Sequence, residues 1–198
     1  MEDRVTRAAV VVRDAVPDDL PVLITMWHEL RDLGGRLDRS MPAISEDGVL
    51  DRLRLIADDP HSRALVGVID GDVAGMAVLT TSSYAPLFDQ NAVHVHYLHV
   101  REGYRRRGVG HALLATAVAA ADEAGVEHIL TSVMPALRDT QRFYARLGFS
   151  PVVTRRSVPV SMLRRRLAGE GRMSLADNVV ARRRTLRRVR AAVARVTE

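Results

Sequence analysis

Cysteine is absent from this chain of 198 residues. Its absence excludes disulfide bonds, thiolate metal ligands and a cysteine nucleophile. It also agrees with a reducing cytoplasm, where we expect the protein to be located. Aromatic residues are scarce, at 4% of the sequence, so aliphatic side chains have to form most of the core. Hydrophobic residues reach 47% in total, which is enough for a globular domain and excludes a disordered chain.

Lysine is also absent, and all 29 basic residues are arginine. The protein therefore has no lysine side chain that can be acylated. Long apolar runs are missing as well: none approaches the roughly 20 residues that cross a bilayer. The mixed charges of residues 1–7 do not fit a signal peptide. We expect neither a membrane-spanning helix nor a leader.

The formal net charge of +5 is unevenly distributed along the chain. Residues 1–150 contain 16 arginines and 21 acidic residues, a net charge of −5, whereas residues 151–198 contain 13 arginines and 3 acidic residues, a net charge of +10. We predict two parts, a domain over residues 1–168 and a basic C-terminal extension over residues 169–198.

The extension has the pattern of a basic amphipathic helix. Ser174 and Asp177 resemble a capping box, and valine and leucine residues then recur at a spacing of about seven between arginine-rich faces. We favour packing of this apolar stripe on the protein's own domain. Helix pairing in a homodimer is the second interpretation. Contact with nucleic acid or an anionic membrane is the least favoured, because aromatic anchors are absent.

The hydrophobic pattern predicts alternating strands and helices. Strands are expected over residues 8–13, 64–69, 73–79, 92–100, 127–134, 152–154 and 158–163. Helices are expected after Asp18 or Asp19, after Ser45, over residues 108–124 and over residues 137–147. Asp70-Gly71 is typical of the tight turn of a hairpin. Hairpins and crossover helices together predict an α/β (α+β) fold, with a mixed sheet flanked by helices.

A basic turn between the fourth expected strand and the following helix is the most informative segment. It contains Arg105, Arg106, Arg107, Gly108, Val109 and Gly110. A helix N-terminus presents unpaired N–H groups and a partial positive charge. Glycines let the backbone approach an anion, and arginines add charge-assisted hydrogen bonds. The turn is therefore a candidate diphosphate site, although an exposed basic turn would contain the same residue types.

Two other phosphate motifs fail in this segment. A dinucleotide fingerprint needs a third glycine where Leu113 stands, and a Walker loop needs a lysine. The segment instead resembles the Arg/Gln-x-x-Gly-x-Gly/Ala signature of the GNAT superfamily of acyl-CoA-dependent N-acyltransferases. Residues 142–149 are similar to that family's Phe-Tyr-x-x-x-Gly-Phe block, and the element order resembles the family over about residues 8–165.

The resemblance implies a GNAT-like sheet that is mostly antiparallel, and acetyl-CoA as cosubstrate. It implies that backbone groups of Leu98, His99 and Val100 bind the pantetheine arm. It also implies that the pyrophosphate is bound by Arg105, Arg106, Arg107, Gly108, Val109, Gly110 and His111. The family often has an asparagine where this chain has Leu137, so one side-chain contact to the cofactor is missing.

Amine acetylation needs a base for the amine, a polarised thioester carbonyl and an acid for the departing thiolate. Tyr144 is the candidate acid, because a phenol with a reference pKa of about 10 keeps its proton at neutral pH. The alternative is a tyrosine that only packs in the core. A main-chain N–H near Leu98 or His99 is the expected polariser of the carbonyl.

His94 and His96 are the candidate bases, because two neighbouring imidazoles can pass a proton outward through water. Strand alternation predicts that they share a face with Leu98 and Val100, with His99 on the other face. That arrangement disfavours a metal site, which needs three converging ligands; we predict no metal. The alternative is a solvated polar strand face. The arylalkylamine N-acetyltransferases are similar here, since they carry His-x-His at the same distance from the turn.

The acceptor is less well specified. The net charge of residues 1–150 favours a cationic amine, and Trp27, Tyr84 and Phe88 are candidates to line its pocket, although each equally fits a core position. We predict an N-acetyltransferase that acts directly on a primary amine of a small molecule. The alternatives are an enzyme that acetylates a protein or peptide amine, and a non-catalytic acyl-CoA-binding module.

Overall fold

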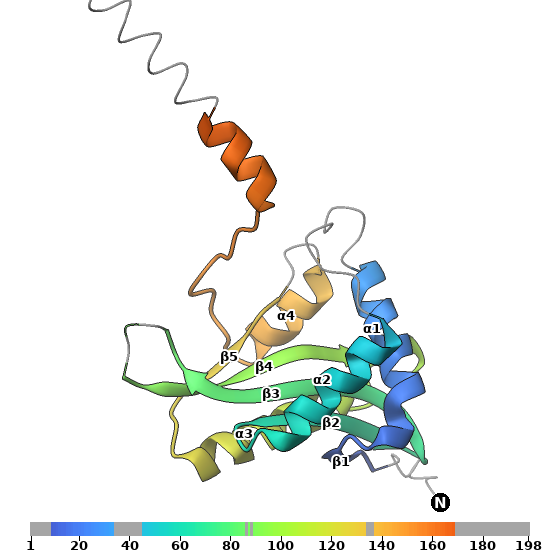
Figure 1. The fold of residues 1–198 in the computed structure, drawn as a ribbon. Coiled ribbons are helices and arrows are strands. Elements are labelled where there is room, and N and C mark those ends of the chain that lie inside the picture. The colour runs from blue at the N-terminus through green and yellow to red at the C-terminus, as the bar shows by residue number, and fades with distance from the viewer. Residues whose placement is uncertain (1–8, 34–44, 86, 88, 134–136, 169–198) are drawn as a thin grey trace, which may run out of the picture. The chain divides into compact units, whose positions relative to one another are not determined.

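The computed structural model describes residues 9–33, 45–85, 87, 89–133 and 137–168. They fall into two units that divide after Ser150. The first unit contains the helices and strands labelled in Figure 1. The helices are α1 (Leu20–Leu33), α2 (Glu46–Asp58), α3 (Val109–Ala124) and α4 (Arg138–Arg146). The strands are β1 (Val11–Asp14), β2 (Ser62–Ile69), β3 (Asp72–Ser83), β4 (Asn91–Val100) and β5 (Ile129–Thr131).

The strands form one mixed sheet in the order β1-β2-β3-β4-β5. The first three pairings are antiparallel, and β4 pairs with β5 in parallel. Asp70 (φ 53°) and Gly71 (φ 87°) form the tight turn between β2 and β3, as the sequence predicts. The mixed, mostly antiparallel sheet with helices packed on it confirms the predicted fold class (Figure 1).

Each face of the sheet carries its own core, because successive side chains of a strand point to opposite faces. On one face, Val66 and Met76 pack against α1, mainly against Leu23, Met26 and Leu30. On the other face, the sheet packs against α3 and against Tyr144 of α4. This second core is formed by Leu65, Ile69, Ala74, Ala77, Leu79, Val93, Val95, Val109, Leu113, Leu114, Ala117 and Ala121.

The helix boundaries follow the terminators in the sequence. Gly125 (φ 63°) ends α3 and Gly148 (φ 88°) follows α4, both in the left-handed conformation that favours glycine. Ser45 caps α2 by accepting a hydrogen bond from the N–H of Gly48 at 3.1 Å. α1 is described as far as Leu33, and the glycines that follow it in the sequence, Gly34 and Gly35, lie outside the described residues.

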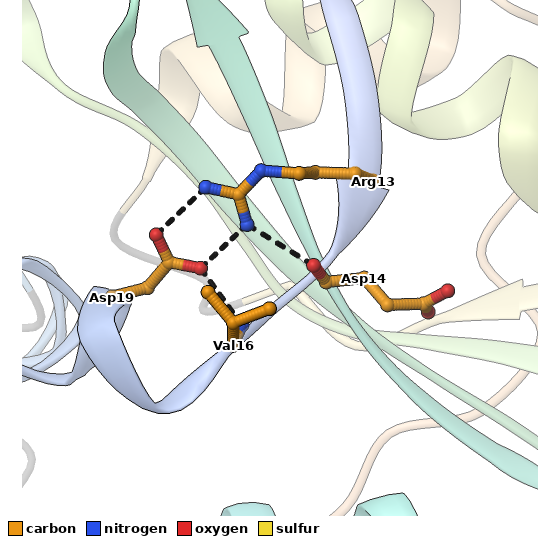
Figure 2. Close-up of polar contacts among 4 residues, drawn as sticks. All are labelled: Arg13, Asp14, Val16 and Asp19. Carbon is orange, nitrogen blue, oxygen red and sulfur yellow. Dashed lines mark hydrogen bonds and ion pairs between the residues drawn. The ribbon is translucent and has the colours of Figure 1, made fainter.

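Asp19 stands directly before α1, where the sequence predicts that a helix begins. It lies in a short 3-10 helix, Pro17–Asp19, that leads into α1. Its carboxylate accepts hydrogen bonds from Arg13 at 2.6 and 2.9 Å and from the N–H of Val16 at 2.9 Å. Figure 2 shows this carboxylate facing the Arg13 guanidinium, which also donates to the main-chain oxygen of Asp14. Asp19 therefore fixes the connection from β1 to α1.

The second unit corrects two predictions. The strands expected over residues 152–154 and 158–163 are not formed: residues 151–159 have no regular structure, and residues 160–168 are helical. The segment from Ser161 to Ala168 is rich in Met, Leu, Arg and Ala, which favour helix, and this preference outweighs the short valine pattern. The basic helix predicted over residues 169–198 lies outside the described residues, so the domain boundary at residue 168 remains a prediction.

The fifth expected strand, residues 127–134, is limited to the three residues of β5. Among the described residues, no helix combines the length and apolar character needed to span a membrane.

Candidate functional site

The candidate site is built around a fork between β4 and β5. The parallel pairing joins Val93 to Ile129, His94 to Leu130 and Val95 to Thr131. β5 ends at Thr131, whereas β4 continues to Val100. Within the described residues, the part of β4 after Val95 therefore has no partner on the β5 side. Its main-chain groups there are available to an extended ligand, as the family resemblance implies for Leu98 to Val100.

A β-bulge distorts β4 at this fork. On β3, one residue separates Met76 from Val78, whereas two residues, Tyr97 and Leu98, separate their partners His99 and His96 on β4. Tyr97 adopts a left-handed conformation with φ 54°. An extra residue in one strand is left out of the ladder and redirects the neighbouring side chains. The bulge therefore takes Tyr97 and Leu98 out of the β3–β4 register, at the point where the sequence predicts a polariser.

The bulge also overturns the predicted alternation of β4. His99 pairs with Met76, which packs against α1, and His96 and His94 pair with Val78 and Thr80 along the same face of β3. Leu98 and Val100 pack into the core on the α3 face. All three histidines therefore share the α1 face, and the prediction that His94 and His96 share a face with Leu98 and Val100 is wrong. The cause is the extra residue at Tyr97.

His94 and His96 lie side by side on this face, as predicted. Their rings are stacked, with centroids 5.9 Å apart and planes 4° apart. His96 Nε2 is hydrogen-bonded with Thr80 Oγ1 at 3.0 Å, and His94 Nε2 donates to the main-chain oxygen of Ser83 at 3.3 Å. The two imidazoles thus lie next to each other on β4, and each has a hydrogen-bond partner on β3.

His99 is held apart from these two histidines. Its side chain is buried, and its Nε2 atom is hydrogen-bonded with Glu29 Oε2 of α1 at 2.8 Å. Although the three histidines share a face, the described residues contain no group of three or more His, Cys, Asp or Glu residues that fits a metal ion. The His99–Glu29 contact instead ties α1 to β4 close to the bulge.

The basic turn between β4 and α3 has the backbone of an anion site. A short 3-10 helix, Glu102–Tyr104, is followed by two left-handed residues, Arg106 with φ 62° and Gly108 with φ 97°. Gly108 is the N-cap of α3, and the helix begins at Val109. The first N–H groups of a helix have no acceptor within the helix. Those of α3 therefore point out of the helix at the end of the turn.

Two glycines in the sheet let α3 begin close to the strands. Gly67 of β2 and Gly75 of β3 are direct cross-strand partners. A Cβ atom at either position would lie 2.8 Å from Cγ1 of Val109, the first residue of α3. Only glycine leaves room for Val109 here. The sequence alone does not reveal this pair, because a strand glycine carries no sign of its partner in the fold.

The arginines of the turn make contacts within the protein. Arg105 Nε donates to the main-chain oxygen of Val100 at 3.3 Å, and Arg107 is 3.4 Å from Asp70 Oδ2 in the β2–β3 turn. These two arginines are therefore attached to the end of β4 and to the β2–β3 hairpin. His111 lies in the first turn of α3, where its ring meets that of Phe143, with centroids 5.3 Å apart.

Tyr144 points from α4 into the core beside the fork. It is buried, with 4% of its surface exposed, and its ring packs against Phe143 and Phe149. Burial raises the pKa of Tyr144, and a hydrogen bond with the Thr131 side chain lowers it in part. Thr131 in turn donates to the main-chain oxygen of Val95 at 3.2 Å. The Tyr144 hydroxyl therefore lies at the last paired residues of β4 and β5.

Of the residues expected to line the acceptor pocket, only Trp27 and Tyr84 are among the described residues. Trp27 of α1 meets Tyr97 edge to face, with centroids 5.0 Å apart, and thus contacts the bulge. Tyr84 meets His128 at 5.4 Å, and Phe88 lies outside the described residues. Leu137 is the N-cap of α4 and makes no side-chain capping hydrogen bond.

A hollow of about 500 Å³ between α2, β1 and β2 is lined by residues that include Val16, Leu50, Leu53 and Arg63. None of its lining residues belongs to the predicted site. Because the fork, the bulge and the turn all lie on β4 and the elements that follow it, we place the candidate site there and not in this hollow.

Comparisons with known proteins bear on the fold and on the family. No curated protein matches the chain. The chain is similar to a solved GCN5-related N-acetyltransferase from Ralstonia eutropha JMP134 (25% identity, TM-score 0.59, covering 77% of this chain and 99% of that one). It is similar to a predicted acetyltransferase with acetyl-CoA from Clostridium acetobutylicum (14% identity, TM-score 0.61, covering 78% of this chain and 98% of that one). It is also similar to the aminoglycoside N-acetyltransferase AAC(6')-Iy in complex with CoA (20% identity, TM-score 0.59, covering 77% of this chain and 97% of that one).

A family model covers most of the first unit. The model of the acetyltransferase (GNAT) family matches residues 27–149, which include the turn before α3 and the aromatic block of α4. This range is more than half of the chain. The chain therefore belongs to the GNAT family of acetyltransferases.

Proposed function

We propose that the protein transfers the acetyl group of acetyl-CoA to a primary amine by direct attack, without a covalent intermediate. One observation carries the proposal: the buried hydroxyl of Tyr144 lies where β5 ends, beside the bulged segment of β4. An acid at this point is close to any thioester that extends along the free edge of β4. Family membership supports the acetyl transfer itself.

Acetyl-CoA fits the site as cosubstrate. The turn before α3 combines left-handed residues at Arg106 and Gly108 with the free N–H groups of a helix N-terminus, which suits a pyrophosphate. The unpaired edge of β4 suits the amide-bearing pantetheine arm. Two of the similar solved structures contain CoA or acetyl-CoA. The cosubstrate would supply the activated acetyl thioester.

The proposed reaction forms a bond between the amine nitrogen and the acetyl carbonyl carbon and breaks the carbon–sulfur bond. His94 or His96 accepts the proton that the amine loses, directly or through water. Main-chain N–H groups beside the bulge, near Leu98 or His99, polarise the carbonyl oxygen. Tyr144 donates its proton to the departing thiolate, and because burial raises the pKa of Tyr144, the phenol is protonated at neutral pH.

The proposed acceptor is a cationic small-molecule amine. The net charge of −5 over residues 1–150 attracts a cation. AAC(6')-Iy, which shares the fold, is an aminoglycoside N-acetyltransferase. Trp27 and Tyr97 pack together on the histidine face of β4 and offer an aromatic surface to the acceptor. A peptide amine is the alternative acceptor, and a panel of both kinds of amine distinguishes them.

The first experiment is a calorimetric titration of acetyl-CoA into the protein. Binding at micromolar concentration is expected. A panel of amines is then assayed for thiol release, and the Tyr144→Phe variant is measured with the best acceptor. Loss of a general acid is expected to lower kcat by about 100-fold, with little change in the dissociation constant of acetyl-CoA. Binding without thiol release from any amine would instead indicate a non-catalytic acyl-CoA-binding module.

A further inference from the structure

The β2–β3 hairpin is attached to the basic turn by side chains that the proposed mechanism does not use. The Tyr104 hydroxyl donates to Asp72 Oδ2 at 2.8 Å. The Arg107 guanidinium is 3.4 Å from Asp70 Oδ2. Asp70 is in the hairpin turn and Asp72 is the first residue of β3, whereas Tyr104 and Arg107 flank the start of the turn before α3. Two carboxylates of one hairpin thus hold two residues of the other segment.

The Tyr104 ring is the centre of this cluster. The guanidinium carbons of Arg101 and Arg107 lie over it, 5.7 and 5.4 Å from its centroid, within the range of cation–π attraction. Arg101 is further tied to β3, because its N–H donates to the main-chain oxygen of Ala74 at 3.0 Å and its guanidinium donates to that of Val73 at 3.4 Å. The Tyr104 side chain is therefore held by Asp72 at its hydroxyl and by two arginines at its ring.

The backbone at Arg106, within the turn, has a conformation that the surrounding structure has to support. Arg106 has φ 62° between Tyr104 and Gly108. A left-handed conformation is unfavourable for a residue with a side chain and persists only where the surrounding structure holds it. Arg105 and Arg107, the two neighbours of Arg106, are held by Val100 and Asp70. The two residues that contact the hairpin, Tyr104 and Arg107, thus lie before and after Arg106 in the sequence.

We propose that the Tyr104–Asp72 and Arg107–Asp70 contacts hold the turn before α3 in its anion-binding conformation, so that Tyr104 and Asp72 are positioning residues for the cofactor. The inference rests on the proposed acetyl-CoA site. It also assigns Arg107 a supporting role in place of the direct phosphate contact implied by the resemblance. The pyrophosphate is then bound mainly by the N–H groups of the turn and of the first turn of α3.

The cluster acts on the pyrophosphate and not on the thioester. Its residues lie at the end of β4 that leads into α3, whereas Tyr144 and Thr131 lie at the fork. Loosening the turn should therefore weaken ligands that contain the pyrophosphate. A ligand that has only the thioester arm should bind as before. A merely structural role for Tyr104 would weaken both kinds of ligand together.

The test compares Tyr104→Phe with the unmodified protein. Acetyl-CoA binding is measured by calorimetry, and S-acetylpantetheine, which lacks the pyrophosphate, by ligand-observed NMR. We expect the dissociation constant of acetyl-CoA to rise about tenfold, the effect of losing one hydrogen bond to a charged group, and that of S-acetylpantetheine to stay unchanged. Asp51→Asn, which removes the carboxylate of an exposed pair on α2, should alter neither and is the control for the charge that Asp72→Ala removes in the double-mutant cycle.

A double-mutant cycle identifies the contact responsible. If the hydrogen bond is what matters, adding Asp72→Ala to Tyr104→Phe weakens acetyl-CoA binding little further. Equal acetyl-CoA binding by Tyr104→Phe and the unmodified protein, or an equal loss for both ligands, overturns the inference alone. Failure of the unmodified protein to bind acetyl-CoA at millimolar concentration overturns the proposed function and the inference with it.

Discussion

The ring of Phe143 lies over Gly110, so that a Cβ atom added at Gly110 would stand 3.2 Å from Cζ of Phe143. Gly110 is in the first turn of α3 and Phe143 precedes Tyr144 in α4. The proposed pyrophosphate site and the proposed acid are therefore in contact through one ring. A change at Gly110 is expected to affect both.

We predict that Gly110→Ala raises the KM for acetyl-CoA and also lowers kcat, each by several-fold, because Phe143 has to move and Tyr144 moves with it. Steady-state kinetics with an active acceptor measure both constants. Phe143→Leu makes room for the added methyl group. Gly110→Ala should therefore lower kcat less when it is added to Phe143→Leu than when it is added to the unmodified protein. Gly103→Ala is the control, since a Cβ there meets nothing within 4 Å. A loss confined to KM would contradict the coupling.

Thr131 is predicted to orient the acid. Thr131→Val removes the hydroxyl that bonds Tyr144, and because that hydrogen bond lowers the pKa of Tyr144, its loss should raise the pKa further. A less acidic and less well oriented phenol donates its proton more slowly, so we expect kcat to fall by roughly 3- to 30-fold, below the effect of losing the acid itself. The high-pH limit of kcat should move upward.

Thr116→Val is the matched control for this prediction. Thr116 donates to the main-chain oxygen of Ala112 within α3 at 3.2 Å, so the same substitution there leaves Tyr144 untouched. Equal rates for Thr131→Val and the unmodified protein would show that the hydrogen bond has no part in the reaction.

Much of the fold was predictable because local signals agree with the tertiary structure. Asp70-Gly71 marks the hairpin, and Gly125 and Gly148 mark helix ends, since each adopts the left-handed conformation that these residue types favour. The site was predictable in outline for the same reason: the glycines of the turn before α3 and the Phe143-Tyr144 block are local patterns. The structure brings both patterns together through Phe143.

The errors arise where the structure depends on distant contacts. Strand alternation gave the wrong faces for Leu98 and His99, because the bulge at Tyr97 inserts a residue that no local pattern in the sequence announces. Thr131 was not identified because its role depends on where β5 ends beside β4. The pair Gly67 and Gly75 was missed because its purpose is to make room for a helix more than thirty residues later in the chain.

Asp19 is predicted to stabilise the fold in a pH-dependent way. The hydrogen bond from Arg13 lowers the pKa of Asp19, with a further contribution from Val16 N–H. A carboxyl group with a lower pKa in the folded state contributes stability that is present above its unfolded value of about 3.9. That stability is lost as the pH falls through the folded value. Asp19→Asn should therefore lower the free energy of unfolding at pH 7 by about 1–3 kcal/mol.

Urea unfolding at pH 7 and at about pH 3 measures this effect, and the difference between Asp19→Asn and the unmodified protein should shrink at the lower pH. Asp51→Asn removes an exposed carboxylate that pairs with Arg54 at 3.3 Å, and it should change stability by less than about 1 kcal/mol. A difference for Asp19→Asn that does not depend on pH would mean that its carboxylate charge is not what stabilises the fold.

The two strand glycines provide a prediction that separates two kinds of crowding. A Cβ at Gly67 would meet only side chains, with Val109 Cγ1 the nearest at 2.8 Å, whereas a Cβ at Gly75 would also lie 2.8 Å from the main-chain oxygen of His99. Either alanine should lower the free energy of unfolding by about 1–3 kcal/mol through overpacking. Val109→Ala removes the side-chain contact but cannot move a β4 carbonyl group.

In a Val109→Ala background, Gly67→Ala should therefore cost little, whereas Gly75→Ala should remain destabilising. Chemical unfolding of the four variants measures each increment against Val109→Ala alone. If both alanines become equally harmless in that background, β4 can yield at His99, and the close contact of β3 with the main chain of β4 is not what requires glycine at position 75. If Gly75→Ala alone stays destabilising, it also weakens acetyl-CoA binding, because the same shift displaces the edge of β4 that is proposed to hold the pantetheine arm.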